Sequence, residues 1–306
     1  MHSWQGNLIL LYFRVNRFLF TRPGELNVEK DRLELESMAK FFKPLVPIQC
    51  TPIVVNNMPA EWITPLGSAA ERVVLYIHGG SFNAGSVKSH RPLAANIALV
   101  CKARALIIDY RLAPEHPYPC AVEDTLAAYE WLLASGIPPE KIVIAGDSAG
   151  GTLTLALLIQ LRDLGKPLPA LAVCLSPATD LTMSGDTWTC NKAKDIMLDT
   201  RNIRTCIEIY LREADPRSPL ASPLFADLHG LPPILIQVGS EECLLSDCTR
   251  FAEKAREAGS PVTLEVWDGM QHVWQYAASF MPEGKQAISK IGEYVDTIMA
   301  HQPLRQ

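Results

Sequence analysis

Ser148 lies at the centre of Gly146-Asp147-Ser148-Ala149-Gly150, a G-x-S-x-G pattern that can present a serine as a nucleophile. The apolar, β-branched run 141–145 before it predicts a buried strand, and the apolar stretch 151–161 after it predicts a helix. A serine on so sharp a turn projects its hydroxyl, and the turn needs small residues two positions before and after it. The alternative is an ordinary strand-to-helix turn with an idle serine. Two further segments argue against that alternative.

The first of these segments is His78-Gly79-Gly80, which follows the apolar run 73–77. Glycines in such a loop leave backbone N–H groups free to point at a developing oxyanion. We expect the N–H groups of Gly79, Gly80 and Ala149 to form this oxyanion hole. The second segment is a loop histidine, His272, just past the alternating, strand-like run 262–267.

A carboxylate at the end of another strand completes the set. The buried run 234–238 leads through Gly239 and Ser240 to the neighbouring acids Glu241 and Glu242. The resulting chain order of serine, acid and histidine is the one that a serine hydrolase with a nucleophile elbow requires. In that chemistry the histidine accepts the serine proton, and the acid holds the imidazole in the correct tautomer.

Together these motifs make the chain resemble the hormone-sensitive-lipase-like esterases of the α/β-hydrolase superfamily, close to their bacterial branch. The resemblance extends from about residue 70 to the C-terminus, and it implies a mostly parallel central sheet with helices on both faces and a helical cap. It also implies a serine carboxylesterase that hydrolyses short- to medium-chain acyl esters through an acyl-enzyme, without a cofactor. The matching stretches are His78-Gly79-Gly80, 109–115, 146–151, Ser176-Pro177 with Asp180, and Asp268-Gly269-Met270 with His272.

The resemblance also implies roles for single residues. Its motifs place the acid at Glu242, although the family usually has aspartate there. Neighbouring side chains in an extended turn point apart, so Glu241 and Glu242 cannot both reach the imidazole. His78 is expected to orient the oxyanion loop, and Asp147 to support the nucleophile turn. The charged residues Asp109, Arg111, Glu115 and His116 resemble a structural ion-pair network of the family.

From residue 71 onward, strand-like and helix-like runs alternate as in a doubly wound parallel sheet. Two stretches fall outside this alternation: residues 1–45, which hold two helical patterns, and an unpatterned insertion at about 183–224. The resemblance implies that both lie over the nucleophile as a cap, with residues 46–306 as the catalytic domain. An acyl pocket could be lined by Phe82, Met183, Trp188 and Trp274.

The expected strands are 73–77, 103–109, 141–145, 171–175, 234–238 and 262–267. The expected helices are 119–135, 151–161, 246–259 and about 283–300.

Composition excludes several classes of partner. The net charge is -5 over 306 residues, which disfavours binding to nucleic acid or to an anionic membrane surface. The apolar run 8–13 is too short to span a bilayer, so no stable membrane insertion is expected. The eight cysteines contain no C-x-x-C pair, which is typical of reduced thiols in a cytoplasmic protein. The oligomeric state stays open, a homodimer included.

Three alternatives remain to be weighed. Ser37 and Lys40 match the S-x-x-K pattern of β-lactamase-like enzymes, but no S-D-N or K-T-G companion follows. An amidase or deacetylase could use the same three residues. A non-catalytic ligand receptor also shares the fold, as the plant gibberellin receptor does, but that receptor lacks the histidine that His272 supplies here. No dinucleotide, phosphate-loop or zinc motif is present, and we expect no metal.

Overall fold

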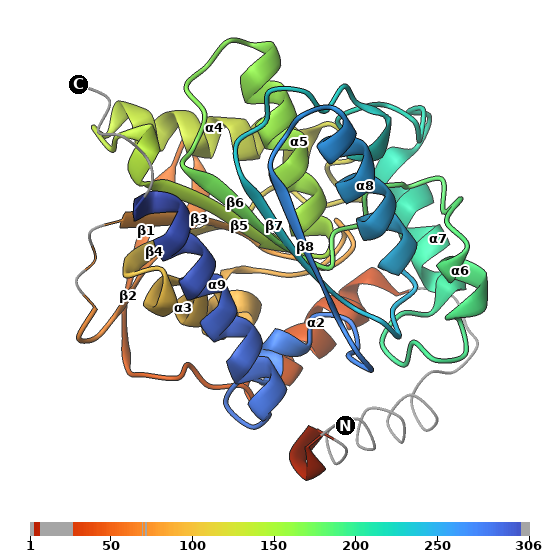
Figure 1. Cartoon of the computed structure of the whole chain (residues 1–306), viewed down its shortest axis with the longest axis horizontal. Helices are drawn as coiled ribbons and strands as arrows, with labels where there is room; N and C mark the ends of the chain where they lie inside the picture. The colour runs from red at the N-terminus through yellow and green to blue at the C-terminus, as the bar shows by residue number, and fades with distance from the viewer. Residues whose placement is uncertain (1–2, 7–26, 69, 71, 301–306) are drawn as a thin grey trace.

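The structure is a computed structural model that describes residues 3–6, 27–68, 70 and 72–300 (Figure 1). One eight-stranded sheet runs through it in the order β1-β2-β4-β3-β5-β6-β7-β8. Strands β3 to β8 are parallel to one another, whereas β2 is antiparallel to both β1 and β4. The strands are β1 (Ile48–Val55), β2 (Met58–Pro65), β3 (Arg72–Ile77), β4 (Ala103–Ile108), β5 (Ile142–Asp147), β6 (Leu171–Leu175), β7 (Ile234–Gly239) and β8 (Val262–Trp267).

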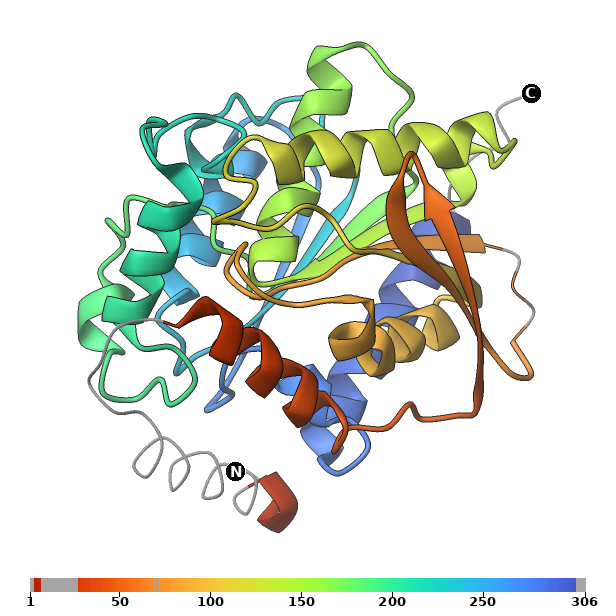
Figure 2. The ribbon, with the colours of Figure 1, turned by 180° about the vertical axis from the view of Figure 1, so that it is seen from behind.

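Helices cover both faces of this sheet (Figures 1 and 2). α4 and α5 pack on one face together with α8, and α3 and α9 pack on the other. The α-helices are α2 (Val28–Ala39), α3 (Val87–Val100), α4 (Cys120–Ala134), α5 (Ala149–Asp163), α6 (Thr187–Cys190), α7 (Thr200–Leu211), α8 (Leu245–Glu257) and α9 (Pro282–Ala300). Short 3₁₀ helices are η1 (Pro139–Lys141), η2 (Pro223–Phe225) and η3 (Trp274–Ala277).

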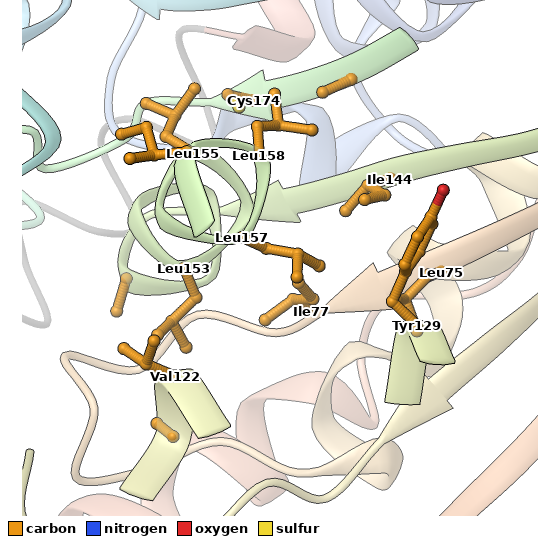
Figure 3. Close-up of a cluster of buried hydrophobic side chains, with 14 of the residues drawn as sticks. Leu75, Ile77, Val122, Tyr129, Ile144, Leu153, Leu155, Leu157, Leu158 and Cys174 are labelled. Carbon is orange, nitrogen blue, oxygen red and sulfur yellow. The ribbon is translucent and has the colours of Figure 1, made fainter. Parts of the chain in front are cut away.

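The two cores follow from the alternation of side chains along each strand. In β3, Leu75 and Ile77 face the core under α4 and α5, whereas Val74 and Tyr76 face the core under α3 and α9. All six residues of β5 are buried, as expected for a central parallel strand. Figure 3 shows Leu157 of α5 in the first core, close to Ile77. The nucleophile strand is therefore held on both faces.

The predicted fold class is confirmed, and each of the six predicted strands is present. The hairpin β1–β2 and the helix α3 were not predicted. The insertion at about 183–224 is also more ordered than expected, since it contains α6, α7 and η2. Of the two helical patterns expected in residues 1–45, the second corresponds to α2, and the first lies largely in residues 7–26, outside the described residues. Among the described residues, no helix is both long and apolar enough to cross a bilayer.

Candidate active site

Ser148 sits on a strained turn between β5 and α5. Its backbone has φ 52° and ψ −121°, a left-handed value that few non-glycine residues adopt. The flanking glycines are required by close backbone approach. A Cβ on Gly146 would lie 2.4 Å from the carbonyl oxygen of Gly150, and one on Gly150 would lie 2.0 Å from that of Ile77. The local sequence therefore presents the serine at the carboxyl edge of the sheet.

His272 and Glu242 meet at the same edge, from the loops after β8 and β7. The Nδ1 atom of His272 is 2.8 Å from Oε2 of Glu242, which is fully buried. The other carboxylate oxygen, Oε1, accepts hydrogen bonds from the Ser176 hydroxyl at 2.8 Å and the Gly239 N–H at 2.6 Å. These contacts fix the carboxylate and leave Nε2 of His272 for other partners. Glu241 is half-buried, and among the described residues its side chain forms no hydrogen bond or ion pair with the imidazole.

The environment favours the charged form of His272. Burial alone would lower the pKa of His272, but the hydrogen bond to Glu242 raises it, and so do the negative charges of Glu242, Asp195 and Asp147. The net result is a pKa above the ordinary value of 6.5. A histidine with such a pKa can accept a proton and hold it until it is passed on.

The oxyanion loop after β3 differs from expectation at one residue. The N–H of Gly79 donates to Oδ1 of Asp147 at 3.1 Å, so it is not available to a substrate. The assignment of Gly79 to the oxyanion hole is therefore corrected. Within the described part of the chain, the N–H groups of Gly80, Ser81 and Ala149 donate to no protein acceptor. Ser81 was missed by sequence reasoning, although it directly follows the glycine pair.

Asp147 ties the loop to the nucleophile turn. Its carboxylate accepts from Tyr76 Oη at 2.6 Å, and it lies 3.3 Å from Nε2 of His90. Burial would raise the pKa of Asp147, but the neighbouring His90 and the hydrogen bonds outweigh burial and hold that pKa below 3.8. His78 is fully buried, and burial together with His90 lowers its pKa to about 3. His78 Nδ1 lies 2.8 Å from the Gly79 carbonyl oxygen, so His78 and Asp147 both contact the oxyanion loop, and their supporting roles stay predictions.

Two hollows open beside Ser148. The larger one, about 280 Å³, contains Ser148, His272 and Gly80 in its lining, with apolar side chains from α2 and η3. The smaller is an apolar recess of about 20 Å³. Phe82 and Trp188 line the recess and Trp274 lines the larger cavity, whereas Met183 is not among the lining residues of either. The recess is lined by Ser81, Phe82, Ser148, Ala149, Ala178, Trp188, Leu198, Ile203, Ile207 and Leu244.

The remaining candidates lie elsewhere. Ser37 is exposed on α2 and is not among the lining residues of either hollow beside Ser148. The predicted charged run does not form one network, because its members pair with other elements. Arg111 forms ion pairs with Glu123 and Asp124 of α4, whereas Glu115 forms an ion pair with Arg32 of α2.

Comparison with known proteins agrees with this geometry. Residues 74–276 match the family model described as the alpha/beta hydrolase fold. The chain is 46% identical over 277 residues to an acetyl-hydrolase of Streptomyces hygroscopicus, covering 90% of this chain and 92% of that protein. It is similar to the crystal structure of an esterase from the bacterial hormone-sensitive lipase family, with TM-score 0.92, 43% identity, and 98% and 99% of the two chains covered. It is also similar to the esterase EstE5 soaked with p-nitrophenyl butyrate, with TM-score 0.91, 41% identity, and 97% and 99% covered.

Proposed function

The chain belongs to the bacterial hormone-sensitive-lipase family of esterases with the α/β-hydrolase fold, and from that membership we propose how its own residues cleave an ester. Ser148 is the nucleophile, His272 the general base and acid, and Glu242 the residue that positions the imidazole. The observation that carries this proposal is the 2.8 Å contact between His272 Nδ1 and Glu242 in the lining of a cavity shared with Ser148. The substrates are esters with short- to medium-chain acyl groups.

In the first half of the reaction, the Ser148 hydroxyl oxygen bonds to the ester carbonyl carbon while its proton moves to Nε2 of His272. The carbonyl electrons collect on the oxygen, which the N–H groups of Gly80, Ser81 and Ala149 stabilise. Loss of one such donor typically costs about 100-fold to 1000-fold in turnover. The tetrahedral adduct then collapses. The bond to the alcohol oxygen breaks, and His272 returns its proton to that oxygen.

In the second half, water attacks the acyl-enzyme and gives its proton to His272. The bond from carbon to Ser148 then breaks, and the same proton restores the hydroxyl. The products are one carboxylic acid and one alcohol, so a water molecule is consumed and no oxidant or reductant is needed.

Two segments form the cap in this proposal: residues 1–45, through α2, and the insertion at about 183–224, through α6 and α7. Support comes from the cavities, since Leu35 and Met38 of α2 line the larger one and Trp188 and Ile203 line the recess. We also propose a reducing compartment, because none of the eight cysteines, all of which lie in the described residues, is in a disulfide.

Covalent labelling tests the nucleophile. A fluorophosphonate probe should modify Ser148 alone, and peptide mapping by mass spectrometry identifies the labelled serine. Ser148→Ala should lose both labelling and turnover of p-nitrophenyl esters, while the matched control Ser37→Ala keeps both. Faster turnover of a p-nitroanilide than of the matched ester would instead indicate an amidase. A label on Ser37 would overturn the assignment.

A further inference from the structure

Both hollows are lined by Ser148, and they share only two other lining residues, Ser81 and Leu198. His272, Gly80 and Ser148 line the larger cavity. Ala149 and Ser148 line the recess, and His272 does not. An ester has two arms, one on each side of the carbonyl carbon that Ser148 attacks. The asymmetry of the site can therefore assign each arm to a hollow.

The position of His272 decides which cavity holds the alcohol arm of the ester. Nδ1 of His272 is engaged by Glu242, so only Nε2 can deliver a proton to the leaving oxygen. The alcohol arm must then lie on the histidine side, in the larger cavity. The oxyanion accepts hydrogen bonds from the N–H groups of the loop after β3 and from that of Ala149 at the start of α5. The acyl arm is left with the direction away from His272, which is the recess.

The recess is small. Its volume is about 20 Å³, against roughly 10 to 15 Å³ for a space that holds one water molecule on the same kind of measure. A methyl group fits such a space, and an ethyl group nearly fills it. A butyl chain does not fit unless the walls move.

The walls are held in place. The indole Nε1 of Trp188 donates to the buried carboxylate of Asp247 at 3.1 Å. Phe82 is stacked on Tyr210, with ring centroids 3.9 Å apart and an interplanar angle of 7°. Both aromatic side chains are almost fully buried. Moving either aromatic wall would therefore break a buried hydrogen bond or a ring stack.

The opposite hollow is large and mostly apolar. Leu35, Met38 and Phe42 line it from the α2 side, and Trp274 and Met281 line it from the segment after His272. Its volume of about 280 Å³ is more than ten times that of the recess. This cavity can desolvate a long or ring-shaped apolar alcohol.

We propose that the recess is the acyl subsite, and that the substrates are acetate and propionate esters of bulky apolar alcohols. The inference rests on the proposed function, and it narrows the short- to medium-chain range given there. In this assignment, Trp188 and Ile203 of the insertion limit the acyl group, whereas α2 contacts only the alcohol. The insertion also reaches the alcohol side, since Met197 and Leu198 line the larger cavity.

A pair of isomeric esters tests the proposal on the wild-type enzyme. Hexyl acetate and ethyl hexanoate have the same atoms and similar intrinsic reactivity, but opposite distributions of bulk. A pH-stat assay should give a kcat/KM at least about tenfold higher for hexyl acetate, since a single misplaced methylene already costs about tenfold or more. Equal rates, or faster cleavage of ethyl hexanoate, would overturn the subsite assignment.

Two variants locate the effect. Ile203→Ala on α7 widens only the recess, so it should raise the hexanoate-to-acetate ratio of p-nitrophenyl esters by about tenfold. Met38→Ala on α2 is the matched control, because Met38 lines only the larger cavity, and it should leave that acyl ratio within about threefold. The reverse ranking would move the acyl arm to the larger cavity. Ile203→Val serves as a milder variant where Ile203→Ala unfolds.

Failure of this inference can be told apart from failure of the proposed function. Fluorophosphonate labelling of Ser148 reports on the nucleophile alone. Labelling together with a preference for ethyl hexanoate would refute only the subsite assignment. Absence of labelling on Ser148 would refute the proposed function itself.

Discussion

His272 is subject to two opposing influences, burial and the carboxylate of Glu242. Burial favours the neutral ring, and the hydrogen bond and negative charge favour the protonated ring. The second influence is stronger, so the pKa of His272 lies above 6.5. The residue must be neutral to accept the serine proton.

The first prediction concerns the pH dependence of turnover. The logarithm of kcat/KM should rise with unit slope as pH increases, and it should level off only above a pKa higher than 6.5. Stopped-flow or pH-stat measurements between pH 5 and 9 check the position of this limb. A rate that is flat between pH 5 and 8 would contradict a role for His272 as base.

The second prediction separates the two neighbouring glutamates. Glu242→Gln keeps the volume of the side chain but removes the negative acceptor at Nδ1, so turnover should fall by about 10³-fold to 10⁴-fold. The residual activity should also titrate at lower pH, because one cause of the raised pKa is gone. Glu241→Gln is the matched control and should cost less than about tenfold in kcat. A larger loss in the Glu241 variant would transfer the role to that residue.

At the scale of single residues, the family motifs predicted that Glu242, and not Glu241, lies beside His272. The structure places Oε2 of Glu242 2.8 Å from Nδ1 of His272, and Ser148 and His272 line one cavity. The catalytic roles of these residues stay predictions. The amide of Gly79 was assigned wrongly, because nothing in the sequence indicates that Asp147 already accepts its hydrogen. A hydrogen bond between a backbone N–H and a distant side chain depends on the folded geometry, and the neighbouring Ser81 was missed for the same reason.

At the scale of elements, buried parallel strands were predictable because β3 and β5 are continuous apolar runs. The hairpin strand β1 was not, since most of its residues are exposed or half-exposed and give no alternation. Helix α3 was missed because it buries Ser89, His90 and Asn96 and contains Pro92, which weakens its periodic pattern. In α7, by contrast, Asp199 caps the helix, and the buried Cys206, Ile207, Tyr210 and Leu211 lie along one side. That signal was available in the sequence.

The third prediction tests how α2 is held over the larger cavity. Arg32 donates to the carbonyl oxygens of Asn83 at 2.7 Å and Ala113 at 3.0 Å, and it forms a two-pronged ion pair with Glu115. Arg32→Ala should loosen this attachment and raise KM for hexyl acetate by at least about threefold, with a loss of about 1 to 3 kcal/mol of stability. Steady-state kinetics and thermal unfolding measure the two effects.

The control for that prediction lies on the same helix. Among the described residues, Lys30 forms an ion pair only with Glu34, one turn away, and both side chains are 62% exposed. Such a pair is worth about 0.5 kcal/mol or less. Lys30→Ala should therefore change neither KM nor the melting temperature measurably. An equal effect of the two substitutions would mean that α2 is not held by Arg32.

For the molecule as a whole, the active-site cavity is assembled from distant parts of the chain. Leu35 and Met38 come from α2, whereas Trp274 and Met281 lie near the other end of the chain. The resemblance to the family implied that residues 1–45 lie over the nucleophile, whereas the sequence pattern indicated only that they do not belong to the sheet. Neither could predict the volumes of the two hollows. Those depend on side-chain packing between α7, α2 and η3, and the inferred acyl preference depends on them.

The last prediction concerns stability against acid, to which two buried groups contribute with opposite signs. His78 has a folded pKa of about 3 against 6.5 when unfolded, so the unfolded state binds more protons between these values. Its contribution to stability is complete above pH 6.5 and falls as pH decreases. Asp247 has a folded pKa of about 7 against 3.8, because burial and the charge of Asp180 disfavour its ionisation. Its contribution is complete below pH 3.8 and is lost as pH rises toward 7.

Between pH 6.5 and 4.5 each group contributes on the order of 2 to 3 kcal/mol, with opposite signs, so the two largely offset each other. The urea midpoint of the wild type should therefore shift little from these two groups over this range. Acidification should raise the midpoint of His78→Gln relative to the wild type, because only the contribution of Asp247 remains. It should lower the midpoint of Asp247→Asn, which retains only that of His78. If the urea midpoint depends on pH in the same way in all three proteins, neither group has a shifted pKa. Neither buried site would then exclude charge in the folded state.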